Sequence, residues 1–156
     1  MVYYDTIAPA YQELYKEEQM EKIREIMDLV DIKEDDFILD LGCGSGFLEP
    51  FIRGYYIGLD ISKELLRKIK GNKLLGDATR LPFKDRSFDW VFCITVLQDI
   101  KDKVKVLREI KRVGKRSVIT IFKRNYTREQ VLSMFKQAEL EINIFKELSK
   151  DFLILC

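Results

Sequence analysis

Residues 37–46, FILDLGCGSG, constrain the fold of this chain more than any other stretch. The first five are apolar except for one acid and lack the alternation of a half-exposed strand, which indicates a buried strand of a parallel sheet. The glycines at 42, 44 and 46 allow a sharp turn and a close approach of the backbone to a ligand. A short helix over residues 47–52 would then present its free N–H groups at the turn. Together these features predict a nucleotide-binding edge.

The rest of the chain alternates strand patterns with helix patterns. Such alternation predicts an α/β fold with a doubly wound parallel sheet, helices on both faces, and ligands at the carboxyl ends of the strands. A capping-box pair, Thr127 with Gln130, opens the last helix, which extends to about residue 138. The predicted strands are 55–60, 73–77, 89–95 and 116–122, the predicted helices between them are 64–69 and 100–113, and residues 141–147 and 151–156 predict a closing antiparallel hairpin.

The segment before residue 37 predicts a helix over residues 6–30, in one piece or two. We expect 1–36 to form a helical lid and 37–156 a Rossmann-like core, within one domain, because 156 residues supply one core and not two large ones. The apolar stripe of the predicted helix is Leu14, Met20, Ile23, Ile26, Met27 and Val30.

The composition excludes several kinds of chemistry. The chain has no histidine, which rules out Ser-His-Asp and Cys-His mechanisms and histidine-ligated zinc. Its three cysteines, Cys43, Cys93 and Cys156, are spaced neither as metal ligands nor as a disulfide framework, so we expect reduced, buried thiols and no metal. No apolar run approaches the roughly 18 residues of a membrane span, and the first residues do not resemble a signal peptide. These features predict a soluble, cytoplasmic protein with no membrane partner.

The net charge of +1 hides an asymmetry along the chain. Residues 1–36 carry eleven acids and four bases, whereas residues 101–128 carry eleven bases and two acids. A basic segment of this kind either steers an anionic partner such as nucleic acid or is a solvated surface, and the second interpretation is the more frequent one. Nucleic acid is therefore kept as an alternative partner.

Polar residues fall where the predicted strands end. Asp60 ends the second strand, twenty residues after Asp40, where an acid accepts hydrogen bonds from both hydroxyls of a ribose. Asp77 ends the third strand and Thr95 the fourth, which predicts an adenosine laid across this edge. The alternative is that each acid caps the following helix. We weigh it less, because Ser62 already fills that role after Asp60 and no strong helix follows Asp77.

The spacing of the glycines bears on which nucleotide binds. Gly42, Gly44 and Gly46 give G-x-G-x-G, whereas the dinucleotide fingerprint is G-x-G-x-x-G, which disfavours an NAD-binding oxidoreductase. A phosphate-binding P-loop would need Gly-Lys followed by Ser or Thr, and the chain has no such sequence.

These motifs, in this order, resemble the class I S-adenosylmethionine (SAM)-dependent methyltransferases over nearly the whole chain. The resemblance is to the ubiquinone-biosynthesis-like branch in a minimal single-domain form, and it implies seven strands in the order 3-2-1-4-5-7-6 with the last strand antiparallel. The matching segments are 40–46 (DLGCGSG, the first motif), 58–62 (GLDIS, the acidic second motif), 76–78 with 81–83 (GDA and LPF), 88–91 (FDWV), 96–100 (VLQDI) and the lead-in 4–11 (YDTIAPAY).

The resemblance implies SAM as cofactor, S-adenosylhomocysteine as product, and a role for each matched position. Gly42 and Gly44 would admit the methionine part, with Asp40 near its amino group. Asp60 would bind the ribose, Asp77 and the Ala78 backbone the adenine edge, and Ile61 and Leu81 the adenine faces. Residues 95–97 would line the sulfonium, with Tyr11 closing over it. The expected cofactor-binding residues are Tyr11, Asp40, Gly42, Cys43, Gly44, Asp60, Ile61, Asp77, Ala78, Thr95 and Val96.

Methyl transfer from a sulfonium is an in-line displacement that mainly needs a positioned nucleophile and exclusion of water, so we assign no catalytic residue. The family's N/D-P-P-Y/F motif is replaced by TVLQ at 95–98, which disfavours methylation of adenine or glutamine amino groups. Gln98 is expected to be an exposed helix-start residue, and for Tyr4 and Tyr11 anchoring of the N-terminal helix is an equal alternative. The residues proposed to contact the substrate are Tyr4, Gln98, Lys123, Arg124 and Tyr126.

Three functions therefore stay open. The first is a SAM-dependent methyltransferase acting on a small molecule, RNA or protein. The second is a SAM-binding subunit without its own chemistry that regulates a partner. The third is the disfavoured oxidoreductase. In the first, a homodimer or a small partner subunit would supply substrate recognition.

Overall fold

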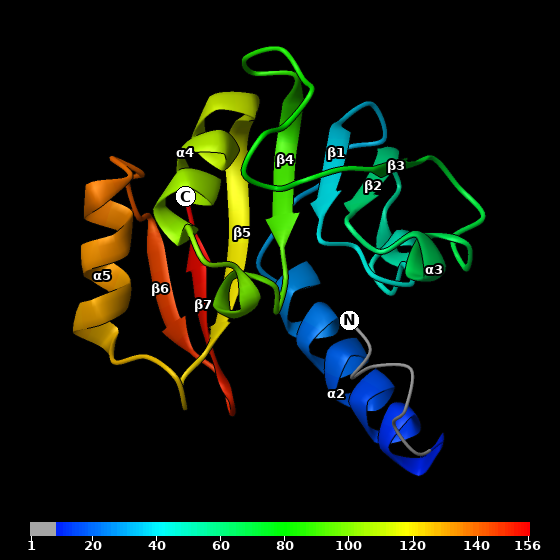
Figure 1. Ribbon diagram of the computed structural model, residues 1–156, viewed down its shortest axis with the longest axis horizontal. Helices are drawn as coiled ribbons and strands as arrows, with labels where there is room; N and C mark the ends of the chain where they lie inside the picture. The colour runs from blue at the N-terminus through cyan, green and yellow to red at the C-terminus, as the bar shows by residue number, and fades with distance from the viewer. Residues whose placement is uncertain (1–8) are drawn as a thin grey trace.

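The structure, a computed structural model, describes residues 9–156, with side chains from residue 13 onward (Figure 1). Its strands form one sheet in the order β3-β2-β1-β4-β5-β7-β6, and β7 is antiparallel to both of its neighbours. The predicted fold and strand order are therefore confirmed. The strands are β1 (Phe37–Leu41), β2 (Tyr55–Asp60), β3 (Lys73–Leu75), β4 (Phe88–Cys93), β5 (Gly114–Phe122), β6 (Ile144–Glu147) and β7 (Asp151–Leu155).

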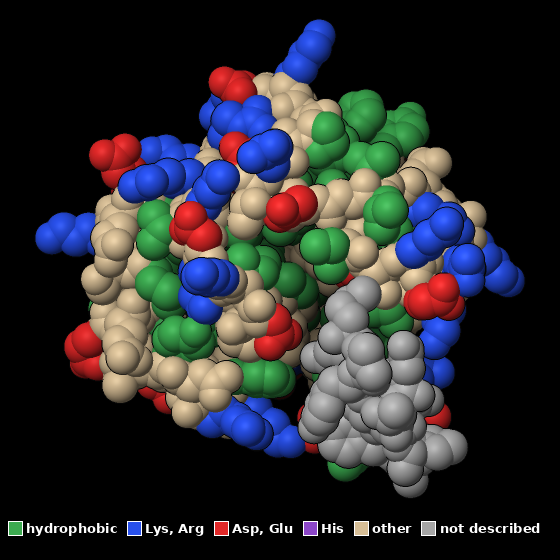
Figure 2. Space-filling view, in the orientation of Figure 1, with side chains coloured by type: hydrophobic (Ala, Val, Ile, Leu, Met, Phe, Trp, Pro, Cys, Tyr) green, Lys and Arg blue, Asp and Glu red, His purple; other side chains and the backbone are tan. Residues whose placement is uncertain are grey.

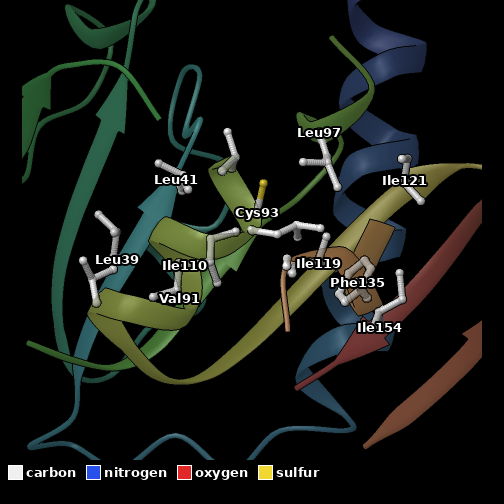
Figure 3. Packing of buried hydrophobic residues seen from close by; sticks show 14 of the residues in the cluster. Leu39, Leu41, Val91, Cys93, Leu97, Ile110, Ile119, Ile121, Phe135 and Ile154 are labelled. Carbon is white, nitrogen blue, oxygen red and sulfur yellow. The ribbon is translucent and has the colours of Figure 1, made fainter. Parts of the chain in front are cut away.

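Helices cover both faces of the sheet, as expected. Helices α4 (Lys103–Val113) and α5 (Arg128–Gln137) pack on one face, where Val91 and Cys93 of β4 point (Figure 3). Helix α2 (Pro9–Met27) packs on the other face against Trp90 and Phe92 of the same strand. Because neighbouring residues of a strand point to opposite faces, β4 contributes to both cores and is apolar throughout its second half.

Several predicted elements are shorter in the structure. The helix expected over 47–52 is a single 3-10 turn, η1 (Glu49–Phe51), and the one over 64–69 is the single turn α3 (Lys63–Leu66). Strand β3 ends at Leu75, because Asp77 closes a turn with Thr79. Strand β4 ends at Cys93. The left-handed backbone of Thr95 is incompatible with the extended geometry that hydrogen bonding in a β-sheet requires.

Helix α2 is one continuous helix, but its buried face differs from the prediction. Leu14 is 55% exposed, whereas Gln19 and Lys22 are buried beside Ile23 and Ile26. In α4 the buried residues are Val106, Leu107, Ile110 and Val113. Among residues 9–156 no helix combines the length and apolarity of a membrane span.

Candidate functional site

The glycine turn after β1 is bound to the end of β2. The N–H groups of Gly42 and Cys43 both donate to the carbonyl of Leu59, at 2.7 and 3.1 Å. Gly42, Gly44 and Gly46 have φ of +72°, +54° and +86°, a geometry that L side chains disfavour. A Cβ on Gly42 would lie 2.4 Å from Cγ2 of Val96, whereas one on Gly44 would meet nothing within 4 Å. Gly42 therefore makes room for Val96, and Gly44 leaves open space for a ligand.

Asp60, the last residue of β2, is held by two backbone groups. Its Oδ2 accepts from the N–H of Gly44 and its Oδ1 from the N–H of Ser62, both at 2.8 Å. Each carboxylate oxygen keeps a further lone-pair site, which suits a pair of ligand hydroxyls. Ser62 does cap α3, as predicted, by accepting from the N–H of Leu65, and Asp60 binds the same loop in addition.

Asp77 closes a turn of its own beyond β3. Its Oδ1 accepts from both the N–H and the hydroxyl of Thr79 at 2.8 Å, in a turn after which no helix begins before β4. These hydrogen bonds keep the pKa of Asp77 below its ordinary value, so that it is ionised at neutral pH. Ile61 beside this turn is 66% exposed, whereas Leu81 is buried in the core and offers little surface to a ligand. Asp60, Ile61, Asp77 and Ala78 are called the β2–β3 half of the site.

Asp40 is a buried carboxyl at the end of β1. Its pKa is raised to about 7, with burial as the largest cause. The Tyr56 hydroxyl, which donates to its Oδ2 at 2.7 Å, opposes the rise, and the charges of Asp60 and Glu49 add to it. Gly58 lies opposite Asp40 in the sheet, and a Cβ there would lie 3.0 Å from the Tyr56 hydroxyl. The small residue thus permits this contact, and Asp40 can gain or lose a proton near neutral pH.

Cys43 in the glycine turn packs into the protein. It is 7% exposed, and burial raises the pKa of its thiol above the ordinary value, which leaves the thiol unreactive. Cys43, Cys93 and Cys156 are all free thiols, and the first two are buried.

Three further predicted residues, Thr95, Val96 and Gln98, follow β4 and are called the β4 half of the site. Val96 packs over Gly42, so the two predicted segments do meet. Gln98 was expected to be exposed but is half-buried in the turn η2 (Leu97–Asp99), and its Oε1 is buried with no hydrogen-bond partner among the described residues. Such an acceptor is costly unless something donates to it.

The proposed substrate residues Lys123, Arg124 and Tyr126 follow β5 at the same edge of the sheet. Lys123 Nζ lies 3.7 Å from Oε2 of Glu147, and Tyr126 faces Lys103, whose Nζ is 5.6 Å from the ring centroid. Tyr4 and the side chain of Tyr11 lie outside the described residues, so the structure does not test them.

The basic segment 101–128 does not form one continuous surface. Gly114 pairs with Phe88, the first residue of β4, so the end of α4 lies at the opposite edge of the sheet from Lys123. There Arg112 pairs with Glu109 and Asp85, and Lys115 pairs with Asp89. On the face of the molecule that Figure 2 draws, Lys and Arg side chains lie at separate places, with acids among them. The solvated-surface interpretation therefore accounts for the end of α4.

A surface hollow of about 350 Å³ also lies at that opposite edge. Two of its lining residues, Phe37 and Tyr55, stack with ring centroids 5.0 Å apart and start β1 and β2. Ligands of doubly wound sheets bind at the carboxyl ends of the strands, so we do not place the cofactor there.

Sequence reasoning missed a cluster of buried polar side chains next to Thr95, formed by Gln19, Lys22, Thr120 and Asp151. A signal was present, because Gln19 and Lys22 have helical spacing with Ile23 and Ile26 and so share their apolar face. Asp151 carried no comparable signal at the start of a strand.

Comparison with known proteins identifies the family. Residues 39–122 match the model of the methyltransferase domain. An uncharacterised protein of Methanocaldococcus jannaschii is 35% identical over 139 residues, covering 85% of this chain and 59% of that protein. A demethylmenaquinone methyltransferase of Lactobacillus johnsonii is 39% identical over 101 residues, covering 54% of this chain and 41% of that enzyme. The chain spans about half the length of the curated relatives it matches.

Solved structures show the same fold. A SAM-dependent methyltransferase from Aquifex aeolicus superposes with a TM-score of 0.72 at 21% identity, covering 87% of each chain. A Haloferax volcanii methyltransferase in complex with the Trm112 activator gives 0.83 at 17% identity, covering 94% of this chain and 93% of the other. With the domain match and the quinone-methyltransferase relative, the observed strand order and glycine turn have one explanation: the chain belongs to the class I SAM-dependent methyltransferase family.

Proposed function

We propose that this chain binds SAM at the carboxyl edge of its sheet and transfers the methyl group to an acceptor by in-line displacement. The observation that carries the proposal is the pair of hydrogen bonds by which Asp60 connects the glycine turn to the loop after β2. One Asp60 oxygen accepts from Gly44 N–H and the other from Ser62 N–H, so a ribose bridging them would lie beside the open space over Gly44. The exposed face of Ile61 lies next to Asp60 and suits a base ring.

The remaining residues would orient the other end of the cofactor. Asp40, when ionised, would attract the amino group of the methionine part, and the buried Oε1 of Gln98 would accept from a ligand donor. Bound SAM supplies an already activated methyl group. The residues of the chain then have to bind, orient and exclude water, which requires no histidine.

Calorimetry tests the cofactor. SAM and S-adenosylhomocysteine should bind and NAD should not, because the glycines lack the dinucleotide spacing. Binding of NAD alone would favour the oxidoreductase. Incubation with methyl-labelled SAM and fractionated cell extract should then label one class of acceptor, small molecule, RNA or protein. SAM binding without any labelled acceptor would favour the non-catalytic subunit.

A small partner protein is the second element of the proposal. The Haloferax volcanii methyltransferase of the same fold is bound to an activator, and this chain spans 93% of it. We therefore expect methyl transfer to rise when the chain is supplied with a small partner from its own cell extract. The check is co-purification on immobilised chain followed by the labelling assay with and without the bound fraction.

A further inference from the structure

Thr95, the residue that begins the β4 half of the site, has a strained backbone. Its φ of +58° lies in the left-handed region, which β-branched residues rarely adopt. The other described non-glycine residues with positive φ, Arg86 and Glu139, are exposed, whereas Thr95 is 8% exposed. Strain of this kind persists only where the surrounding structure enforces it.

Two elements far apart in the sequence hold Thr95. Its N–H donates to Oγ1 of Thr120 in β5 at 2.8 Å. Its own hydroxyl accepts from Lys22 Nζ of α2 at 2.6 Å and donates to Gln19 Oε1 at 3.3 Å. Lys22, Gln19 and Thr120 are 8%, 5% and 0% exposed, so these contacts form away from water. Losing one of them is costly where a polar group is left buried and unpaired.

Lys22 is itself held by Asp151, the first residue of β7. Their Nζ and Oδ2 atoms lie 2.9 Å apart, and both side chains are more than nine-tenths buried. Taking two charges out of water is expensive, and apolar residues of similar volume often stabilise such a site equally well. Helix docking alone does not require an ion pair here. The donor that Lys22 provides to Thr95 is a function that an apolar residue would lack.

The backbone of Thr95 in turn determines where Val96 lies. Val96 packs so closely over Gly42 that a Cβ there would come within 2.4 Å of it. A continuous set of contacts thus runs from Lys22 through Thr95 and Val96 to the glycine turn, whose next glycine, Gly44, binds Asp60.

We propose that Lys22, held by Asp151, is a positioning residue that keeps Thr95 and Val96 against the glycine turn and so shapes the sulfonium side of the SAM site. The inference rests on the proposed function for its ligand but not for its geometry. Helix α2 is then a part of the site, although Lys22 acts through Thr95 and not by contact with the cofactor.

The test is the double variant Lys22→Met with Asp151→Leu. Removing both charges leaves no unpaired buried ion, so the variant should unfold at nearly the wild-type denaturant concentration. The Thr95 hydroxyl would lose the Lys22 donor that helps to hold the residue in place. The Thr95 amide, which donates to Thr120, should then exchange its hydrogen with solvent about tenfold faster, and the Kd for SAM should rise about tenfold. Lys22→Met with Asp151→Asn serves as a second variant where leucine does not fit.

Lys150→Met is the matched control. Lys150 pairs with Glu18, which also joins α2 to the β6–β7 hairpin, but both side chains are more than a third exposed and neither touches Thr95. This control should leave Thr95 exchange and SAM affinity unchanged. Wild-type exchange at Thr95 in the stable double variants would overturn the inference. Faster exchange in a protein whose wild type binds no SAM would support the Lys22 assignment and refute the proposed function.

Discussion

The two halves of the site are held in place in different ways. In the β2–β3 half, Asp60 and Asp77 accept from groups two to sixteen residues away along the chain. In the β4 half, Thr95 is bound to residues 25, 73 and 76 positions away. The first half is therefore encoded in short motifs, whereas the second depends on the docking of α2 and β7. A substitution that leaves one of the buried groups of the second half unpaired should cost stability as well as binding.

The largest effect is expected for Lys22→Met alone. It leaves the Asp151 carboxylate buried without its partner, which should lower the free energy of unfolding by about 3–5 kcal/mol. Urea denaturation at pH 7 measures this loss. Lys150→Met, which breaks a more exposed ion pair of α2, should cost less than about 1 kcal/mol. Equal losses in both variants would contradict the special role of the buried Lys22–Asp151 pair in holding the β4 half.

Asp40 lies in β1, between the β2–β3 half and the β4 half of the site. Its titration should make the stability of the fold depend on pH. Its pKa of about 7 in the folded protein, against 3.8 ordinarily, means that the folded state keeps a proton the unfolded state has released. Stability should therefore fall as the pH rises from about 4 to 7, by up to about 4 kcal/mol from this group. Asp40→Asn should flatten this slope in denaturation curves measured between pH 5 and 8.

Asp77→Asn is the control for that experiment in the β2–β3 half. The pKa of Asp77 is lowered, so its contribution is present at high pH and lost only as the pH falls through the acid range. The slope between pH 5 and 8 should be unchanged in this variant. A flattened slope there would show that Asp40 is not its source.

Alanine substitutions at Gly42 and Gly44 distinguish a glycine needed for packing from a glycine needed for access of the ligand. Gly42→Ala combines a strained φ with a clash against Val96 and should cost about 2–3 kcal/mol of stability. Gly44→Ala meets open space and should cost only the left-handed strain, about 1 kcal/mol, while weakening SAM binding. Thermal unfolding and calorimetry on both variants provide the comparison. Equal stability losses would indicate that Val96 does not lie over Gly42.

The last prediction concerns SAM binding by Asp60→Ala, which also removes the acceptor of the Gly44 and Ser62 N–H groups. Leaving ribose hydroxyls unpaired should weaken SAM binding by about 1–3 kcal/mol. Calorimetry measures it, with Lys150→Met as the variant that should bind SAM as the wild type does. Unchanged affinity in Asp60→Ala would mean that the ribose lies elsewhere.

Most of the fold could be predicted because its signals are local. Buried strands, the capping box at Thr127 and the glycine turn each lie within a few residues, and their order matched a known family. The residues of the β2–β3 half were named from the same motifs. Strand and helix patterns do not register the turn that the Asp77 carboxylate closes with Thr79, because no helix begins there.

The β4 half could not be predicted to the same depth. The left-handed backbone of Thr95 coincides with contacts from Lys22 of α2 and Thr120 of β5, and no spacing along the chain records such a convergence. Gln98 was expected to be exposed because it starts a turn, yet tertiary packing buries its carbonyl oxygen. Burial of a single polar atom depends on the docked elements around it.

A crystal structure of the complex with S-adenosylhomocysteine tests the central claim most directly. We predict both ribose hydroxyls within hydrogen-bonding distance of the Asp60 carboxylate, the adenine against Ile61, and the sulfur beside Thr95 and Val96. A nucleoside bound away from this edge, for example in the hollow lined by Phe37 and Tyr55, would contradict the account.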